Sequence, residues 1–125
     1  MNNELKGLEE DLKGQLFYDS LWRRLFATDA SVYRTVPMAV AYPTDEDDLK
    51  KLISFASKHK TSLIPRTAGT SLAGQCVGEG IVVDVSKYFT SILELDPQKR
   101  RIRVQPGVIR DDLNRHLKSH GLFFG

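Results

Sequence analysis

Pro65-Arg66-Thr67-Ala68-Gly69-Thr70-Ser71-Leu72-Ala73-Gly74-Gln75 is the stretch from which the rest of this chain is interpreted. It follows a short apolar run at residues 62–64 and precedes a stronger one at residues 81–85, and both runs predict β-strands. Gly69, Gly74, Gly78 and Gly80 permit positive φ angles and close approach of another group to the backbone. A loop of this kind can aim successive N–H groups at an anion, and its hydroxyls and arginine add donors. The stretch predicts a phosphate or pyrophosphate site, with a purely structural turn as an equal alternative.

Two familiar nucleotide motifs are not matched. Gly69 and Gly74 have the spacing of a Walker A loop, but Gln75 and Cys76 stand where that loop carries lysine and a hydroxyl residue. The spacing GxGxxG of dinucleotide-binding loops is also absent. An ATPase, a GTPase and an ordinary NAD-binding protein are therefore disfavoured.

Size and composition indicate one globular domain or a fragment of one. The chain has 125 residues, of which 41% are hydrophobic and 27% charged, and its net charge is +2. This balance does not call for nucleic acid as a partner. The single cysteine excludes an internal disulfide and favours a cytoplasmic location. No apolar run approaches the roughly 20 residues of a membrane span, although peripheral membrane contact of a larger enzyme stays open.

The segment 1–34 is predicted to be helical. A first amphipathic helix is expected from four leucines at helical spacing, despite two interrupting glycines. A second short helix is expected to begin at Ser20, with four residues on its apolar side and with Arg23 and Arg24 in solvent. The leucines are Leu5, Leu8, Leu12 and Leu16, and the apolar side of the second helix comprises Leu21, Trp22, Leu25 and Phe26.

A β-α-β unit follows. Residues 38–42 predict a strand, and residues 44–60 predict a helix capped by Thr44, with acidic residues in its first turn and basic residues in its last. Its buried face is expected to carry Leu49, Leu52, Ile53 and Ala56. Parallel pairing of the two flanking strands would make a right-handed crossover.

The last part of the chain predicts a β-hairpin and a helix. Residues 92–95 and 101–104 alternate in polarity around a proline-containing connection. The helix opens at Asp111 and ends near Gly121, with Ile109, Leu113 and Leu117 on its apolar side. The fold class is therefore α+β (mixed α/β): a small β-α-β sheet plus a hairpin, flanked by helices.

Several segments together resemble one family. The chain is similar to the FAD-binding domain of the vanillyl-alcohol oxidase / p-cresol methylhydroxylase (PCMH-type) flavoprotein superfamily. Within it, the chain resembles the branch that contains the D-type subunit of glycolate oxidase and the D-lactate dehydrogenase-like enzymes. The similar segments are 28–34, 37–43, 65–74, 81–84 and 104–108, in the family's order and spacing.

The resemblance implies a function for the glycine-containing stretch. In the family this loop holds the FAD pyrophosphate, a role that transfers to Arg66, Thr67, Ala68, Gly69, Thr70 and Ser71, with Gln75. The turn Pro106-Gly107 is expected beside the flavin site. Thr70 stands near the position where some relatives carry a histidine bonded to flavin, so FAD should be held noncovalently.

The resemblance also implies an incomplete enzyme. Residues 35–125 correspond to the N-terminal part of the FAD-binding domain, and relatives continue with a flavin ring-binding part and a substrate domain. The complete enzyme would oxidise a 2-hydroxy acid such as D-lactate or glycolate. We therefore assign no catalytic residue here and expect the chain alone to be inactive, to bind FAD weakly, and to need the missing C-terminal part as a partner.

Alternatives remain beside this interpretation. The chain could be a phosphate- or nucleotide-binding module without redox activity, or a subdomain that acts only by docking to a partner half. Phe123 and Phe124 make self-association an open outcome. Asp112, His116 and His120 are interpreted as a solvated helix face, with no metal assigned. Cys76 is interpreted as a small packing residue, and the basic residues 99–103 as a charged edge hairpin.

Overall fold

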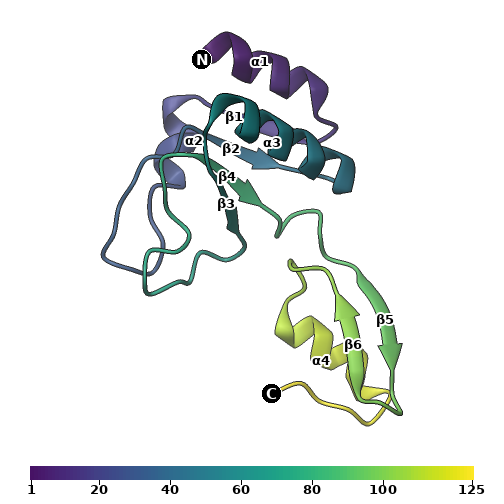
Figure 1. Cartoon of the computed structure of the whole chain (residues 1–125). Helices are drawn as coiled ribbons and strands as arrows, with labels where there is room; N and C mark the ends of the chain where they lie inside the picture. Colours follow the sequence, from purple (N-terminus) through teal and green to yellow (C-terminus); the bar gives the residue numbers. More distant parts are fainter.

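The computed structural model describes all residues 1–125, which form two units joined by a short connection (Figure 1). The first unit is a four-stranded sheet with helices, and the second is a two-stranded sheet with one helix. This arrangement confirms the mixed α/β class. In chain order the elements are α1 (Asn2–Asp11), β1 (Gln15–Phe17), α2 (Ser20–Leu25), β2 (Ala39–Tyr42), α3 (Glu46–His59), β3 (Leu63–Arg66), β4 (Ile81–Asp84), β5 (Ile92–Asp96), β6 (Arg101–Val104) and α4 (Arg110–Lys118).

The four-stranded sheet has the order β1-β2-β4-β3. Strands β2 and β3 both run parallel to β4, and β1 pairs antiparallel with β2. The strands that flank α3 are thus parallel as expected, but they are not neighbours, because β4 lies between them. Every residue of β4 is buried, whereas β3 has an exposed proline, so burial favours β4 at the centre and β3 at the edge.

Helices cover both faces of this sheet. Leu5, Leu8 and Leu52 of α1 and α3 join the core on one face, where they meet alternate residues of β2 and β4 such as Ala39 and Ile81. The other face carries the intervening residues Val40 and Val82 with Ile64, and Phe26 packs there just after α2. This alternation follows from the two-residue period of a β-strand, which sends successive side chains to opposite faces.

The first predicted helix is shorter than its leucine pattern indicates. Helix α1 ends at Asp11, and Leu16 lies in β1, paired with Ala41. Between them, Gly14 passes so close to the Tyr42 carbonyl that a Cβ atom would clash with it. Leu16 is still buried, but it reaches the core from a strand, so the expected helical spacing through Leu16 was wrong.

The second helix also differs in detail from its prediction. Its N-cap is Asp19 and not Ser20, because the Asp19 carboxylate accepts the Trp22 N–H at 3.1 Å. Trp22 stacks on Phe17, whereas Leu21 and Leu25, both expected on the apolar side, are exposed. The expected exposure of Arg23 was wrong, since its Nε donates to the Pro37 carbonyl at 2.8 Å.

Helix α3 confirms the strongest helix prediction but changes its cap. Asp45 is the N-cap, and its carboxylate accepts the Asp48 N–H at 3.0 Å. Thr44, the expected cap, instead donates its N–H and hydroxyl to the carboxylate of Asp48. Asp48 is fully buried, while Ile53, expected on the buried face, is 58% exposed.

The second unit consists of the predicted hairpin and α4. Strands β5 and β6 pair antiparallel, and Leu113 and Leu117 are buried beneath them. Ile109, expected on the same apolar side, lies before the helix and is 64% exposed. Gly121 follows α4 with φ +67°, as its predicted role as a helix stop requires.

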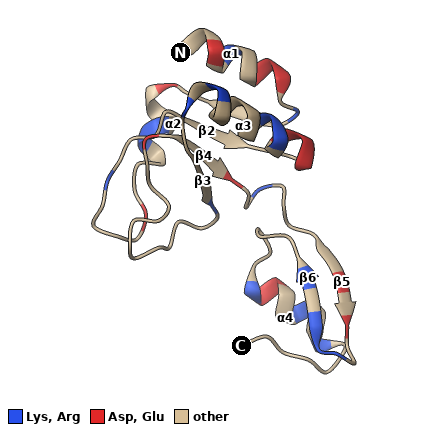
Figure 2. Ribbon diagram, in the orientation of Figure 1, with Lys and Arg blue, Asp and Glu red and all other residues tan.

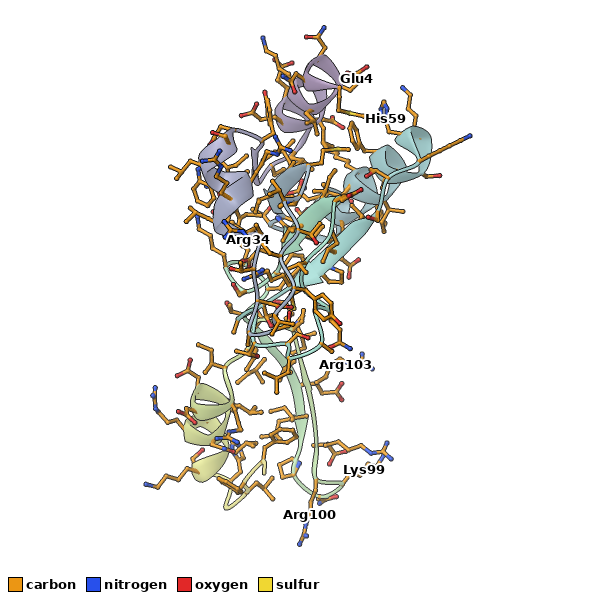
Figure 3. All side chains as sticks on the ribbon, turned by 90° about the vertical axis from the view of Figure 1, so that its left-hand side faces the viewer. Glu4, Arg34, His59, Lys99, Arg100 and Arg103 are labelled. Carbon is orange, nitrogen blue, oxygen red and sulfur yellow. The ribbon has the colours of Figure 1, made fainter.

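The second unit carries basic side chains on its hairpin and its helix. Basic residues mark β6 and α4 (Figure 2), and the hairpin turn carries Lys99 and Arg100 at the end farthest from the first unit (Figure 3). Both residues are exposed, as are Arg101 and Arg103. No helix combines the length and the apolar character needed to cross a membrane.

Candidate functional site

The glycine loop, residues 67–80, leaves the carboxyl end of β3 and returns to the start of β4 without a helix or strand of its own. Gly69 has φ +69° and Gly74 has φ +72°, so both adopt the left-handed conformation that favours glycine. The expectation of a strand followed by a loop is therefore confirmed.

Backbone N–H groups are free along the first half of the glycine loop. Those of residues 67–72 make no hydrogen bond within the chain. The hydroxyl of Ser71 turns back into the loop, where it accepts the N–H groups of Ala73 and Gln75 at 3.3 Å each. It also donates to the Gln75 side-chain oxygen at 3.1 Å. The loop is thus braced by Ser71, while the preceding N–H groups remain available to an anion.

Arg66 lies behind the glycine loop. Its guanidinium donates to the Thr28 carbonyl at 2.7 Å and to the Cys76 carbonyl at 3.4 Å. The same group lies over the Phe26 ring, 5.0 Å from its centroid. A Cβ atom at Gly69 would lie 2.8 Å from the guanidinium carbon, so glycine at this position lets the loop cross the arginine side chain. Arg66 therefore holds loop carbonyls together while leaving its positive charge beneath the loop.

Pro106 and Gly107 connect the second unit to the first. The Gly107 N–H donates to the Phe89 carbonyl at 2.7 Å, and a Cβ atom there would lie 2.6 Å from that oxygen. Pro106 lines a cavity of about 440 Å³, opposite Leu49 and Ile53 of α3. Arg66, Thr67 and Cys76 line the same cavity. The structure thus brings Thr67 and Cys76 of the glycine loop to the Pro106 turn, but Ala68 through Ser71 and Gln75 do not line this space.

A second loop supports the glycine loop and was assigned no site role from the sequence. Asp29 accepts the Cys76 N–H at 3.3 Å, and the Ala30 N–H donates to the Gly69 carbonyl at 3.0 Å. Figure 1 shows the segments 27–37 and 67–80 extending side by side from the sheet. The only sequence signal for this contact was that residues 28–34 belong to the segments that resemble the family.

The other titratable candidates take part in no common site. Asp112 pairs with Arg115 at 2.8 Å, and His116 and His120 are exposed with ring centroids 5.8 Å apart. No group of three or more His, Cys, Asp or Glu side chains is placed to hold a metal ion. Cys76 is a free, half-buried cysteine.

Comparisons with known proteins agree with this fold and loop. Residues 37–125 match the family described as FAD binding domain. D-2-hydroxyglutarate dehydrogenase of Pseudomonas putida is 40% identical to the chain, covering 90% of the chain and 11% of that protein. Glycolate oxidase subunit GlcD of Bacillus subtilis is 36% identical, covering 94% of the chain and 27% of that protein. The structure of p-cresol methylhydroxylase superposes with a TM-score of 0.78 at 15% identity, covering 97% of the chain and 25% of that protein.

The mixed sheet, the glycine loop and the family match define the class of the protein as a flavin-binding domain, and its fold is like that of p-cresol methylhydroxylase. The chain belongs to the FAD binding domain family, which confirms the resemblance and the assignment of FAD as cofactor. It spans about a tenth of the D-2-hydroxyglutarate dehydrogenase and about a quarter of the GlcD protein to which it is similar.

Proposed function

We propose that this chain is the pyrophosphate-holding portion of an FAD-linked oxidoreductase that oxidises a 2-hydroxy acid. The observation that carries the proposal is the run of unpartnered N–H groups at residues 67–72, which includes Gly69 with its positive φ. The names of the relatives support the reaction class, because 2-hydroxyglutarate and glycolate are both 2-hydroxy acids. D-lactate and glycolate are the substrates to test first.

The residues of the loop would share the work of holding the cofactor. We assign the pyrophosphate to the N–H groups of Thr67, Ala68, Gly69, Thr70 and Ser71, with the Thr67 and Thr70 hydroxyls as further donors. Gln75 and Arg66 would act by bracing the loop, through Ser71 and through the loop carbonyls respectively. Pro106 would bound the adjoining cavity, and Gly107 would hold this turn in place through its bond to the Phe89 carbonyl. When bound, FAD supplies the redox chemistry through its flavin ring.

Noncovalent attachment of FAD is part of the proposal. Threonine occupies position 70, and no histidine stands between His59 and His116. Acid or heat denaturation followed by filtration should therefore release flavin from the polypeptide. Flavin that stays with the chain after denaturation would contradict noncovalent attachment through this segment.

The domain division and the location of the protein also remain proposals. We assign residues 1–34, which contain α1, β1 and α2, as an N-terminal segment and residues 35–125 as the N-terminal part of the flavin domain. The flavin ring contacts and the substrate residues would come from a further C-terminal part, so the chain alone should show no turnover. A cytoplasmic location agrees with the free thiol of Cys76.

A docking role is the second candidate function. Phe123 and Phe124 are 79% and 54% exposed at the end of the chain. Exposed aromatic residues favour association, either with a partner half or with a second copy. A colourless preparation that self-associates would favour this role, whereas a yellow preparation would favour the flavoprotein role. A colourless preparation that binds ADP would favour a nucleotide-binding module without redox activity.

Titration of the ¹⁵N-labelled chain tests the assignment of the loop directly. ADP and inorganic pyrophosphate should shift the amide signals of residues 67–72, whereas adenosine, which lacks phosphate, should not. Nuclear magnetic resonance is suited to this test because it detects the weak binding expected when the flavin ring contacts are missing. Shifts confined to other parts of the chain, or none at millimolar ADP, would refute the assignment of this loop.

A further inference from the structure

Two loops that are distant in sequence are joined by a set of hydrogen bonds that we call the clasp. It consists of the bonds from Ala30 N–H to the Gly69 carbonyl, from Cys76 N–H to Asp29, and from Arg66 to the Thr28 and Cys76 carbonyls. Cys76 is therefore held at both of its backbone polar groups. Apart from Arg66 in β3, every member lies outside the helices and strands, so regular secondary structure does not fix the positions of these loops.

The Asp29 side chain is also held by hydrogen bonds within its own loop. One of its oxygens accepts the Ser31 N–H at 2.8 Å and also the Ser31 hydroxyl, which closes a tight turn. The other oxygen accepts the Cys76 N–H. The bond from the Ser31 hydroxyl is the main cause that lowers the pKa of Asp29, and it outweighs partial burial. The Ser31 and Cys76 N–H groups and the charge of Arg66 add to the lowering, so the carboxylate is ionised at neutral pH.

The geometry of the peptide bond determines how these hydrogen bonds orient the N–H groups of the glycine loop. In a trans peptide, the carbonyl of one residue and the N–H of the next point in opposite directions. Because the Gly69 carbonyl is held by Ala30, the Thr70 N–H must point away from the second loop. The clasp thus directs a free N–H group toward the side of the loop where an anion can approach.

We propose that Asp29 is a positioning residue for the cofactor, acting through the clasp on the N–H groups of the glycine loop. This inference rests on the proposed function of that loop. Without the clasp, residues 69–76 would have to be ordered when the ligand binds, and that ordering reduces affinity. With it, much of the ordering is complete in the ligand-free protein.

The Asp29→Asn variant of the full chain tests the proposal. The amide keeps the size of the carboxylate, but its NH₂ end can only donate. The variant can therefore accept hydrogen bonds from Ser31 or from Cys76, but not from both. We expect the affinity for ADP and for inorganic pyrophosphate to fall about tenfold, the effect of losing one charge-assisted hydrogen bond. The matched control is Asp19→Asn, which makes the same carboxylate-to-amide change at the cap of α2, away from the loop, where the remaining amide oxygen can still accept the Trp22 N–H.

A second measurement needs no ligand. The ¹⁵N heteronuclear NOE of residues 69–76 should fall in Asp29→Asn and stay unchanged in Asp19→Asn, while the sheet amides keep their shifts in both. Ser31→Ala is the milder variant if Asp29→Asn does not fold, because it leaves the Asp29 carboxylate in place and removes only the bonds of the Ser31 hydroxyl, which donates to Asp29 and accepts the Tyr33 N–H.

The outcomes separate the two proposals. Absence of any ADP or pyrophosphate response in the unmodified chain would refute the proposed function of the loop. Normal binding by Asp29→Asn would overturn the positioning role while leaving that function intact. An unchanged NOE in the variant would also overturn the positioning role, whether or not the chain binds ADP.

Discussion

Replacing Asp48 by asparagine perturbs the buried carboxylate that joins the start of α3 to the turn before β1. One oxygen of Asp48 accepts the Lys13 N–H at 2.9 Å. The other accepts the Gly14 N–H at 2.9 Å and the N–H and hydroxyl of Thr44 at 3.0 Å each. Asparagine has the same shape, but in its best orientation its NH₂ group would face the Lys13 N–H. The variant therefore places its NH₂ donor against the Lys13 N–H donor. It also removes the negative charge from the acceptor of the Gly14 and Thr44 hydrogen bonds.

The expected loss of stability is about 2–4 kcal/mol. A buried N–H without an acceptor costs about 1–3 kcal/mol, and a hydrogen bond to a charged group contributes about 1 kcal/mol more than a bond between neutral groups. Such a loss is a large fraction of the roughly 5–15 kcal/mol by which small domains are stable. Urea unfolding followed by circular dichroism at pH 7 would measure it.

The matched control is Asp47→Asn. The Asp47 side chain is 65% exposed and contacts only Lys13 Nζ, at 3.4 Å, so its replacement should change the free energy of unfolding by less than about 0.5 kcal/mol. If Asp48→Asn were as stable as Asp47→Asn, the structural role of the buried carboxylate would be wrong.

The pH dependence provides a further check on Asp48. Burial raises its pKa, but the hydrogen bonds from Thr44, Lys13 and Gly14 outweigh burial and hold the pKa below 3.8. A carboxyl whose pKa is lower in the folded state stabilises the fold above its unfolded pKa. That contribution is lost as the pH falls through the folded pKa. The stability difference between the unmodified chain and Asp48→Asn should therefore be constant from pH 7 to about pH 5 and narrow below pH 3.8.

Four other substitutions test the site and its surroundings. Gly69→Val should weaken the ADP response of residues 67–72 at least tenfold in the same titration, because φ +69° strongly disfavours a β-branched residue, and unchanged affinity would contradict this. Gly107→Ala should lower the free energy of unfolding in urea by about 1–3 kcal/mol, because its Cβ would lie 2.6 Å from a backbone oxygen. Gly7→Ala, with open space around it, should instead gain up to about 1 kcal/mol. Phe123→Ser should reduce any self-association seen by ultracentrifugation, and an unchanged sedimentation profile of an associating chain would exclude the exposed ring as its cause.

The local signals in the sequence were sufficient to predict the elements in which the hydrophobic pattern and the other local features indicate the same structure. Helix α3 has acidic residues at its start, basic residues at its end and an apolar stripe between them, and it forms within one or two residues of the prediction. The continuous apolar run of β4 and the alternating polarity of β6 predicted these two strands correctly, because each pattern matches the burial that the strand has in the fold. Positive φ was expected to be open to all four glycines of the loop, because glycine adopts this conformation without steric cost, but only Gly69 and Gly74 adopt it, and Gly78 and Gly80 do not.

The pairing of distant segments was decided only by the tertiary structure. Leu16 has the spacing of a helix residue, but pairing with Ala41 places it in a strand, and the burial gained there overrides local propensity. The position of β4 between β2 and β3 depends on which strand can be buried on both sides, a property of the assembled sheet.

The same holds for the site. The sequence indicated which residues could meet a phosphate, because glycines and hydroxyls at that spacing have a local meaning. It contained no local signal that Asp29 would reach the backbone of Cys76, or that Arg66 would lie beneath the glycine loop. Those contacts join residues that are 47 and 10 positions apart, and apart from Arg66 at the end of β3 they lie in loops without a period that could predict them. They exist because the sheet brings two irregular loops to the same side, where their polar groups find partners in each other.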